Sequence, residues 1–201
     1  MSQDLRTQKT KASIEGSLLD LLERYPFQKI TVKMIIEDCQ INRSTFYRNY
    51  EDKYALIAQI ASRLLTEFGE TLRPEFIIEP NLDDERLRFY FFPLVKYFGK
   101  NKKALLVMRG RELPVNLFED MLDLYSKRLF QVLKRHYCAE GYSADLAGYF
   151  ARIIASNILT AILWWHEKAP KKDEAELLKL ISTTVTKGIF QSMEQHLAQA
   201  W

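Results

Sequence analysis

Hydrogen-bonding side chains crowd a short segment near the N-terminus, around two aromatic residues. Phe46 and Tyr50 are four residues apart, so on a helix they share one face and can anchor it in a core. The polar and amphipathic residues of the segment are Arg43, Ser44, Thr45, Tyr47, Arg48 and Asn49. Arginine pairs well with guanine and asparagine with adenine, and threonine can contact a thymine methyl group or a phosphate. The segment therefore offers the chemistry that reads base edges in DNA.

This segment is expected to be the second helix of a helix-turn-helix. Helical patterns cover Val32–Cys39 and Arg43–Asn49, with a three-residue break between them. Thr31 can cap the first of these helices and Asn42 the second. In such a motif the second helix enters the major groove. A preceding helix is predicted over residues 6–24, and its apolar stripe consists of Ile14, Leu18, Leu21 and Leu22.

The overall charge of the chain gives little support to DNA binding by itself. The whole chain has a net charge of +3, and residues 1–60 contain nine Lys/Arg against eight Asp/Glu. A DNA-binding hypothesis must therefore rest on where the charges lie, because their number is unremarkable.

The rest of the chain favours an all-α fold with about nine helices. It contains only 7 Gly and 6 Pro in 201 residues, so β-turn residues are scarce. A long helix over 52–73 is expected to link an N-terminal domain, residues 1–55, to a larger helical-bundle domain, residues 56–201. Further helical patterns cover 82–99, 102–109, 114–138, 143–167 and 173–199, with a kink or an early end expected at Pro93.

The segment ITVKMIIEDCQINRSTFYRNYEDKYALI resembles the DNA-binding signature of TetR/AcrR-type transcriptional regulators. The matching positions are Thr31, Thr45, Phe46, Tyr47, Tyr50, Asp52 and Lys53. The resemblance implies a three-helix head that binds a palindromic double-stranded DNA operator. It also implies a homodimer and a C-terminal domain that binds a small-molecule effector. Repression is the expected output, although a regulator of this shape can also activate.

The resemblance also implies roles for individual residues. Base or phosphate contacts would come from Thr31, Lys33, Arg43, Ser44, Thr45, Tyr47, Arg48, Asn49 and Lys53. Among these, Tyr47 and Lys53 would contact phosphates. One position departs from the family pattern, because Gln40 stands in the turn where glycine is usual. If that position needs a positive φ, glutamine costs about 1 kcal/mol more than glycine.

Two surfaces are predicted in the C-terminal domain. Aromatic and methionine residues can line a ligand pocket or form ordinary core, and the candidates are Phe89, Phe92, Tyr97, Met108, Phe118, Met121, Tyr125 and Trp165. The last two helices look apolar over more than one face, which predicts that a second subunit covers them. The candidate dimer residues are Ala151, Ala155, Ile158, Ile162, Ile181, Val185 and Gly188.

Enzymatic and metal-binding functions have no support in the sequence. The two cysteines and three histidines are scattered, and no acid, base and nucleophile converge, so no catalytic residue, metal or cofactor is expected. No signal peptide or sufficiently long apolar run is evident, so the protein is expected in the cytoplasm without membrane contact. The alternative to a DNA-binding regulator is a helical small-molecule or partner-binding coregulator that does not bind DNA.

Overall fold

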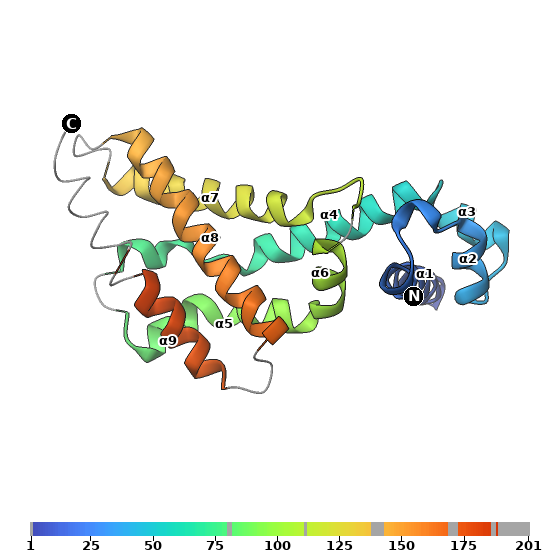
Figure 1. Cartoon of the computed structure of the whole chain (residues 1–201), viewed down its shortest axis with the longest axis horizontal. Helices are drawn as coiled ribbons and strands as arrows, with labels where there is room; N and C mark the ends of the chain where they lie inside the picture. Colours follow the sequence, from blue (N-terminus) through green and yellow to red (C-terminus); the bar gives the residue numbers. More distant parts are fainter. Residues whose placement is uncertain are drawn as a thin grey trace. The chain divides into compact units, whose positions relative to one another are not determined.

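The computed structural model describes residues 2–79, 82–110, 112–137, 143–168, 173–185 and 188. Within these residues the chain is all-α, with nine α-helices, two short 3-10 helices and no strand (Figure 1). The predicted fold class is thus confirmed. The elements are α1 (Ser2–Arg24), η1 (Phe27–Lys29), α2 (Val32–Asp38), α3 (Arg43–Asn49), α4 (Lys53–Thr71), η2 (Pro74–Ile78), α5 (Asp84–Lys100), α6 (Lys102–Arg109), α7 (Leu117–His136), α8 (Ala144–Lys168) and α9 (Glu174–Thr184).

The chain divides into two compact units, and one division falls inside α4. Unit 1 comprises residues 1–66 and 103–117, and unit 2 comprises residues 67–102 and 118–201. This differs from the predicted boundary after residue 55, most of all because residues 103–117 belong to unit 1. The ammonium group of Lys103 gives a physical reason, since it pairs with Asp20 and, at 3.4 Å, with Glu23, both on α1.

The core of unit 1 is built from the apolar stripes that the sequence predicts. Ile14 and Leu18 of α1 are fully buried, as is Phe46 of α3. The Tyr50 hydroxyl donates a hydrogen bond to Glu15 at 3.3 Å, and Glu15 also pairs with Arg63 of α4 at 2.8 Å. Burial and the neighbouring Glu15 raise the pKa of Tyr50, so this hydroxyl stays protonated. These contacts hold α1, α3 and α4 together.

Aromatic side chains fill much of the core of unit 2. The ring of Phe68 lies 5.9 Å from that of Tyr97, 6.4 Å from Phe98 and 6.2 Å from Tyr125, measured between ring centroids. Such tilted and edge-to-face pairs add to the stabilisation that burial provides. Helix α5 continues through Pro93 to Lys100, so the early end considered for this helix does not occur.

Helix α8 is long and apolar enough to cross a membrane by length and composition alone. From the sequence we expected no apolar run long enough to span a membrane. Helix α8 contains polar residues that interrupt such a run, but they are few enough for the helix as a whole to qualify. Half of its most apolar window is buried, and α5 and α9 pack against it within unit 2 (Figure 1). The core helix of a soluble protein passes the same test, so this feature is weak evidence for a membrane span.

Candidate nucleic-acid interface

The first helix of the predicted motif begins where the sequence indicates. The backbone N–H of Met34 donates to the Thr31 hydroxyl oxygen at 3.2 Å, so Thr31 caps α2. Asn42 holds the equivalent position before α3, but its side chain makes no capping hydrogen bond. The prediction for Asn42 is therefore right in position and wrong in chemistry.

The turn between α2 and α3 closes on a glutamine in the left-handed conformation. Gln40 has φ 52°, the only positive value among the described residues other than glycine. The N–H of Ile41 donates to the carbonyl of Ile36 at 3.2 Å, and the N–H of Gln40 donates to that of Glu37 at 3.4 Å. This is the hydrogen-bond pattern of a Schellman motif, which favours glycine at the position of Gln40. The turn therefore has the positive φ for which we expect glutamine to cost about 1 kcal/mol more than glycine.

Helix α3 separates its anchoring face from its polar face. Phe46 and Tyr50 are buried, with ring centroids 6.0 Å apart. The exposed residues of the helix are Arg43, Ser44, Tyr47 and Arg48. The guanidinium of Arg43 lies 5.5 Å from the centre of the Tyr47 ring, a cation–π contact that orders both side chains.

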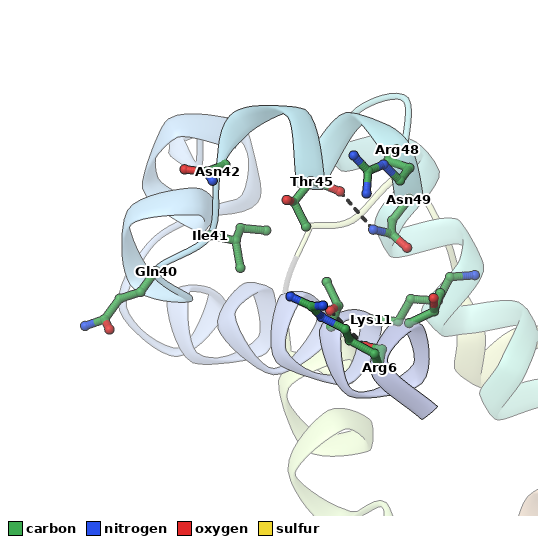
Figure 2. Close-up of a pocket in the computed structure, with 10 residues that line it drawn as sticks. Arg6, Lys11, Gln40, Ile41, Asn42, Thr45, Arg48 and Asn49 are labelled. Atoms are coloured by element: carbon green, nitrogen blue, oxygen red, sulfur yellow. Dashed lines mark hydrogen bonds between the residues drawn. The ribbon is translucent and has the colours of Figure 1, made fainter. Parts of the chain in front are cut away.

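The two remaining polar residues of α3 are half-buried. The Asn49 amide donates to the backbone carbonyl of Thr45 at 2.8 Å, as Figure 2 shows. One N–H of Asn49 is thus already used within the helix, and its carbonyl oxygen is its remaining strong acceptor.

The two predicted contacts on α2 lie at the surface. Thr31 and Lys33 are exposed. Lys33 lies 3.7 Å from Glu37, one helical turn away, and both side chains are largely exposed to solvent. Such a pair contributes little to stability, so Lys33 can exchange this carboxylate for a phosphate at small cost.

Lys53 is placed differently from the other predicted contacts. Its ammonium group donates to the backbone carbonyls of Phe27 at 2.8 Å, Gln28 at 3.1 Å and Ile30 at 2.7 Å. The group also lies 4.7 Å from the centre of the Phe27 ring, and burial lowers the pKa of Lys53. Because an ammonium group has three protons, these carbonyls use them all. Lys53 thus ties η1 to the start of α4, which leaves none of its protons for the phosphate contact that the resemblance implies.

The predicted ligand-pocket residues are mostly buried or half-buried. Tyr97, Met121, Tyr125 and Trp165 are buried in unit 2, whereas Met108 is buried in unit 1. Phe92 and Phe118 are half-buried. Phe89 is 59% exposed on α5, so it does not line an interior cavity. A shared pocket of these residues stays a prediction, without Phe89.

The predicted dimer residues are mostly buried within one chain. Six of the seven are 0–1% exposed within one chain, namely Ala151, Ala155, Ile158, Ile162, Ile181 and Val185. Helices α5, α8 and α9 pack against one another in unit 2, so these side chains leave little surface for a second subunit. Gly188 is exposed. The sequence pattern identified buried helices correctly, and the part that these residues play in a dimer stays a prediction that their burial within one chain does not support.

The opposite face of α8 carries what sequence reasoning missed. A shallow groove of about 530 Å³ lies between α8 and α9. Its principal lining residues are Ile153, Asn157, Thr160, Ala161, Trp164 and Leu180. Trp164 is 48% exposed and Leu180 is 39% exposed. The paired tryptophans of the sequence were the available signal, since adjacent residues on a helix cannot both face one core.

The helix-turn-helix and the all-α chain agree with the fold of TetR-type transcriptional regulators, which the sequence resemblance implied, and the solved structures show that fold. Three solved structures share this fold. A TetR transcriptional regulator from Streptococcus agalactiae is 22% identical to this chain, with a TM-score of 0.57. The match covers 92% of this chain and 98% of the solved chain. The fatty acid degradation regulator FadR from Bacillus halodurans is 15% identical, with a TM-score of 0.63, and the match covers 89% of this chain and 95% of that FadR chain. FadR from Thermus thermophilus, solved in complex with lauroyl-CoA, is 22% identical, with a TM-score of 0.51. The match covers 89% of this chain and 94% of that FadR chain.

One curated relative supports the same class. The uncharacterized HTH-type transcriptional regulator YxbF of Bacillus subtilis is 23% identical over 165 residues, which is 82% of this chain. The match covers 42% of that relative, so the chain spans about two fifths of its length. No family model matches the chain.

Proposed function

We propose that the protein is a sequence-specific DNA-binding transcriptional regulator. One observation carries the proposal: α3 buries Phe46 and Tyr50 while exposing Arg43, Tyr47 and Arg48. A helix held by two aromatic anchors and exposing hydrogen-bonding groups is what major-groove recognition needs. The fold shared with TetR-type regulators supports the same function.

Within this proposal the contact residues divide by role. Arg43, Ser44 and Arg48 are exposed and can reach base edges, whereas half-buried Thr45 and Asn49 lie deeper at the side of the helix. Tyr47, Thr31 and Lys33 contact the DNA backbone at the edges of the interface. Lys53 acts as a positioning residue, because its protons already bind the carbonyls that precede α2.

The regulator acts as a homodimer on a palindromic operator. A two-fold dimer places two recognition helices in successive major grooves, roughly one helical turn of about 35 Å apart. The exposed groove around Trp164 and Leu180 supports a dimer contact through the outer faces of α8 and α9. A partially exposed tryptophan beside aliphatic residues is a typical anchor of a protein–protein interface.

A small-molecule effector that binds unit 2 completes the proposal, with repression in its absence. Thermus FadR was solved with lauroyl-CoA, and this chain shares its fold. The half-buried and buried aromatic residues of unit 2, among them Phe92 and Phe118, provide apolar surface for such a ligand. The effector would change DNA affinity by binding two states of the dimer unequally. On this proposal the protein works in the cytoplasm.

Selection of bound fragments from genomic DNA by the purified protein tests the proposal. We expect a small set of fragments with a shared palindromic element. The alternative, a coregulator that does not bind DNA, predicts no enrichment above a control variant in which Arg43, Arg48 and Tyr47 are all replaced by alanine. Equal recovery with the parent and that variant would favour the coregulator.

A further inference from the structure

A polar groove separates the first turns of α1 from the turn and α3 in unit 1. Its volume is about 730 Å³. Arg6 and Lys11 of α1 border it on one side, and Thr45, Arg48 and Asn49 of α3 border it on the other, as Figure 2 shows. The groove therefore shares residues with the recognition helix and adds residues of α1 that the sequence did not suggest as contacts.

The groove is positively charged although unit 1 is not strongly basic. Among the residues whose side chains the structure describes, three cations line it, Arg6, Lys11 and Arg48, and no Asp or Glu does. In the part of the chain that the structure describes, none of the three has an ion pair. Each cation keeps its full charge for an external partner.

Elsewhere in unit 1 the acidic residues neutralise their neighbours. Arg24 pairs with Asp38 at 3.1 Å, Arg63 pairs with Glu15 at 2.8 Å, and Lys103 pairs with Asp20. These pairs lie outside the groove. The near balance of nine Lys/Arg and eight Asp/Glu in residues 1–60 thus conceals a local excess of positive charge beside α3.

We infer that this groove is a phosphate-binding surface in which Arg6 and Lys11 hold the DNA backbone beside the recognition helix. The inference rests on the proposed function and deepens it. DNA seated on α3 brings its backbone next to Arg48, which belongs to both surfaces. Hydrogen bonds to phosphates position a protein on the duplex without reading sequence. Arg6 and Lys11 would supply the backbone contact that Lys53, with its three carbonyl partners, does not need to make.

The test compares two double variants that remove the same charge. Arg6→Gln with Lys11→Gln removes both positive charges from the α1 side of the groove. The matched control is Lys9→Gln with Lys29→Gln, because both lysines are exposed in unit 1 and neither lines the groove. The full-length proteins are first checked for equal helix content. Binding is then measured at several salt concentrations on a genomically selected fragment and on a random-sequence duplex of equal length.

The groove variant should lose affinity by the same factor on both duplexes. The slope of log affinity against log salt should become shallower by about 0.9 for each lost phosphate contact, or about 2 for each bound unit 1. The control should stay close to the parent. If the parent binds neither duplex, the proposed function fails. If the parent binds and the two double variants have equal slopes, only this inference fails.

A second measurement separates backbone phosphate from a free anion. Inorganic phosphate is titrated into the parent and the groove variant without DNA. Saturable binding that the groove variant loses, together with an unchanged DNA salt slope in that variant, would overturn the inference in favour of a small-anion site.

Discussion

At the residue scale, Gln40 shows how the chain departs from the usual turn of its fold. The sequence placed glutamine where glycine is typical, and the structure gives that residue φ 52°. The free-energy cost of holding glutamine at this positive φ is confined to the turn, so replacing the one residue should remove it.

Gln40→Gly should therefore stabilise the protein by about 1 kcal/mol. Urea unfolding at constant slope measures the change. The matched control is Gln59→Gly, in the exposed interior of α4, which should destabilise by roughly 0.5–1 kcal/mol. A loss of stability in Gln40→Gly as large as that in Gln59→Gly would contradict the strain at the turn.

His166 is a second residue whose environment has a measurable consequence. Its Nε2 atom is buried without a hydrogen-bond partner, and its ring stacks on Phe98 at 6.4 Å between centroids. Burial, as the largest cause, lowers the pKa of His166 below its ordinary value, and Lys102 acts in the same direction. A backbone hydrogen bond to Val95 and the charge of Glu174 oppose the shift without reversing it.

This shift predicts the sign of a pH effect. Between the lowered folded pKa and the unfolded pKa of about 6.5, the unfolded chain binds a proton that the folded chain does not. Stability should therefore fall as pH drops through about 6.5, and His166→Phe should remove that part of the dependence. The free energy of unfolding is measured at several pH values across this range and plotted against pH. A destabilisation by the substitution that is the same at every pH does not change the slope of this plot. His136→Phe, at an exposed histidine of α7, serves as the comparison variant. An unchanged slope in His166→Phe would contradict the prediction.

At the scale of elements, Lys53 links a 3-10 helix to the helix that leaves unit 1. The three carbonyls that it binds belong to residues 27, 28 and 30. Replacing Lys53 by methionine keeps the aliphatic stem but leaves these acceptors without their shared donor. A partly buried acceptor that loses its partner costs more than the bond itself contributed.

Lys53→Met should thus destabilise the protein by about 1–2 kcal/mol. The salt dependence of DNA binding by the folded variant should equal that of the parent, because no phosphate contact is lost. Thermal unfolding and DNA titrations measure the two effects. Lys29→Met, on the exposed surface of η1, serves as the control for stability. Unchanged stability together with a shallower salt slope would instead assign Lys53 to a phosphate.

The elements also show what the sequence can and cannot predict. The apolar stripe with Ile14 and Leu18, and the Phe46–Tyr50 anchor, follow from helical periodicity alone, and both were correct. The role of Lys53 depends on carbonyls 23–26 residues away, which no local pattern encodes. The positive groove depends on which carboxylate meets which cation, and the sequence gives only their numbers.

At the scale of the whole molecule, assembly is the feature that a helical sequence pattern predicts least well. A stripe such as Ala155 and Ile158 signals burial, but it does not say whether the neighbouring helix belongs to the same chain. In the structure both residues are buried within one chain, whereas Trp164 of α8 and Leu180 of α9 are exposed beside the groove between these helices.

The dimer that we propose should therefore depend on the outer face of α8 and α9. Trp164→Glu combined with Leu180→Glu should shift the protein towards monomer, because two charges would be desolvated at the interface. Sedimentation velocity over a range of concentrations measures the shift. Tyr149→Glu is the control, since Tyr149 is 59% exposed on α8 and does not line the groove. An unchanged dimer in the double variant would place the interface elsewhere.

The most direct test of the central claim is the specificity ratio of α3 variants. The measurement is the affinity for a genomically selected fragment divided by that for a random duplex of equal length, at one salt concentration. Arg43→Ala should lower this ratio by about 1–3 kcal/mol in free-energy terms, through loss of a base-edge contact. Lys29→Ala, at an exposed lysine outside the interface, should leave it unchanged. A parent protein whose ratio is one, or a ratio that Arg43→Ala and Arg48→Ala both leave intact, would contradict recognition of DNA by α3.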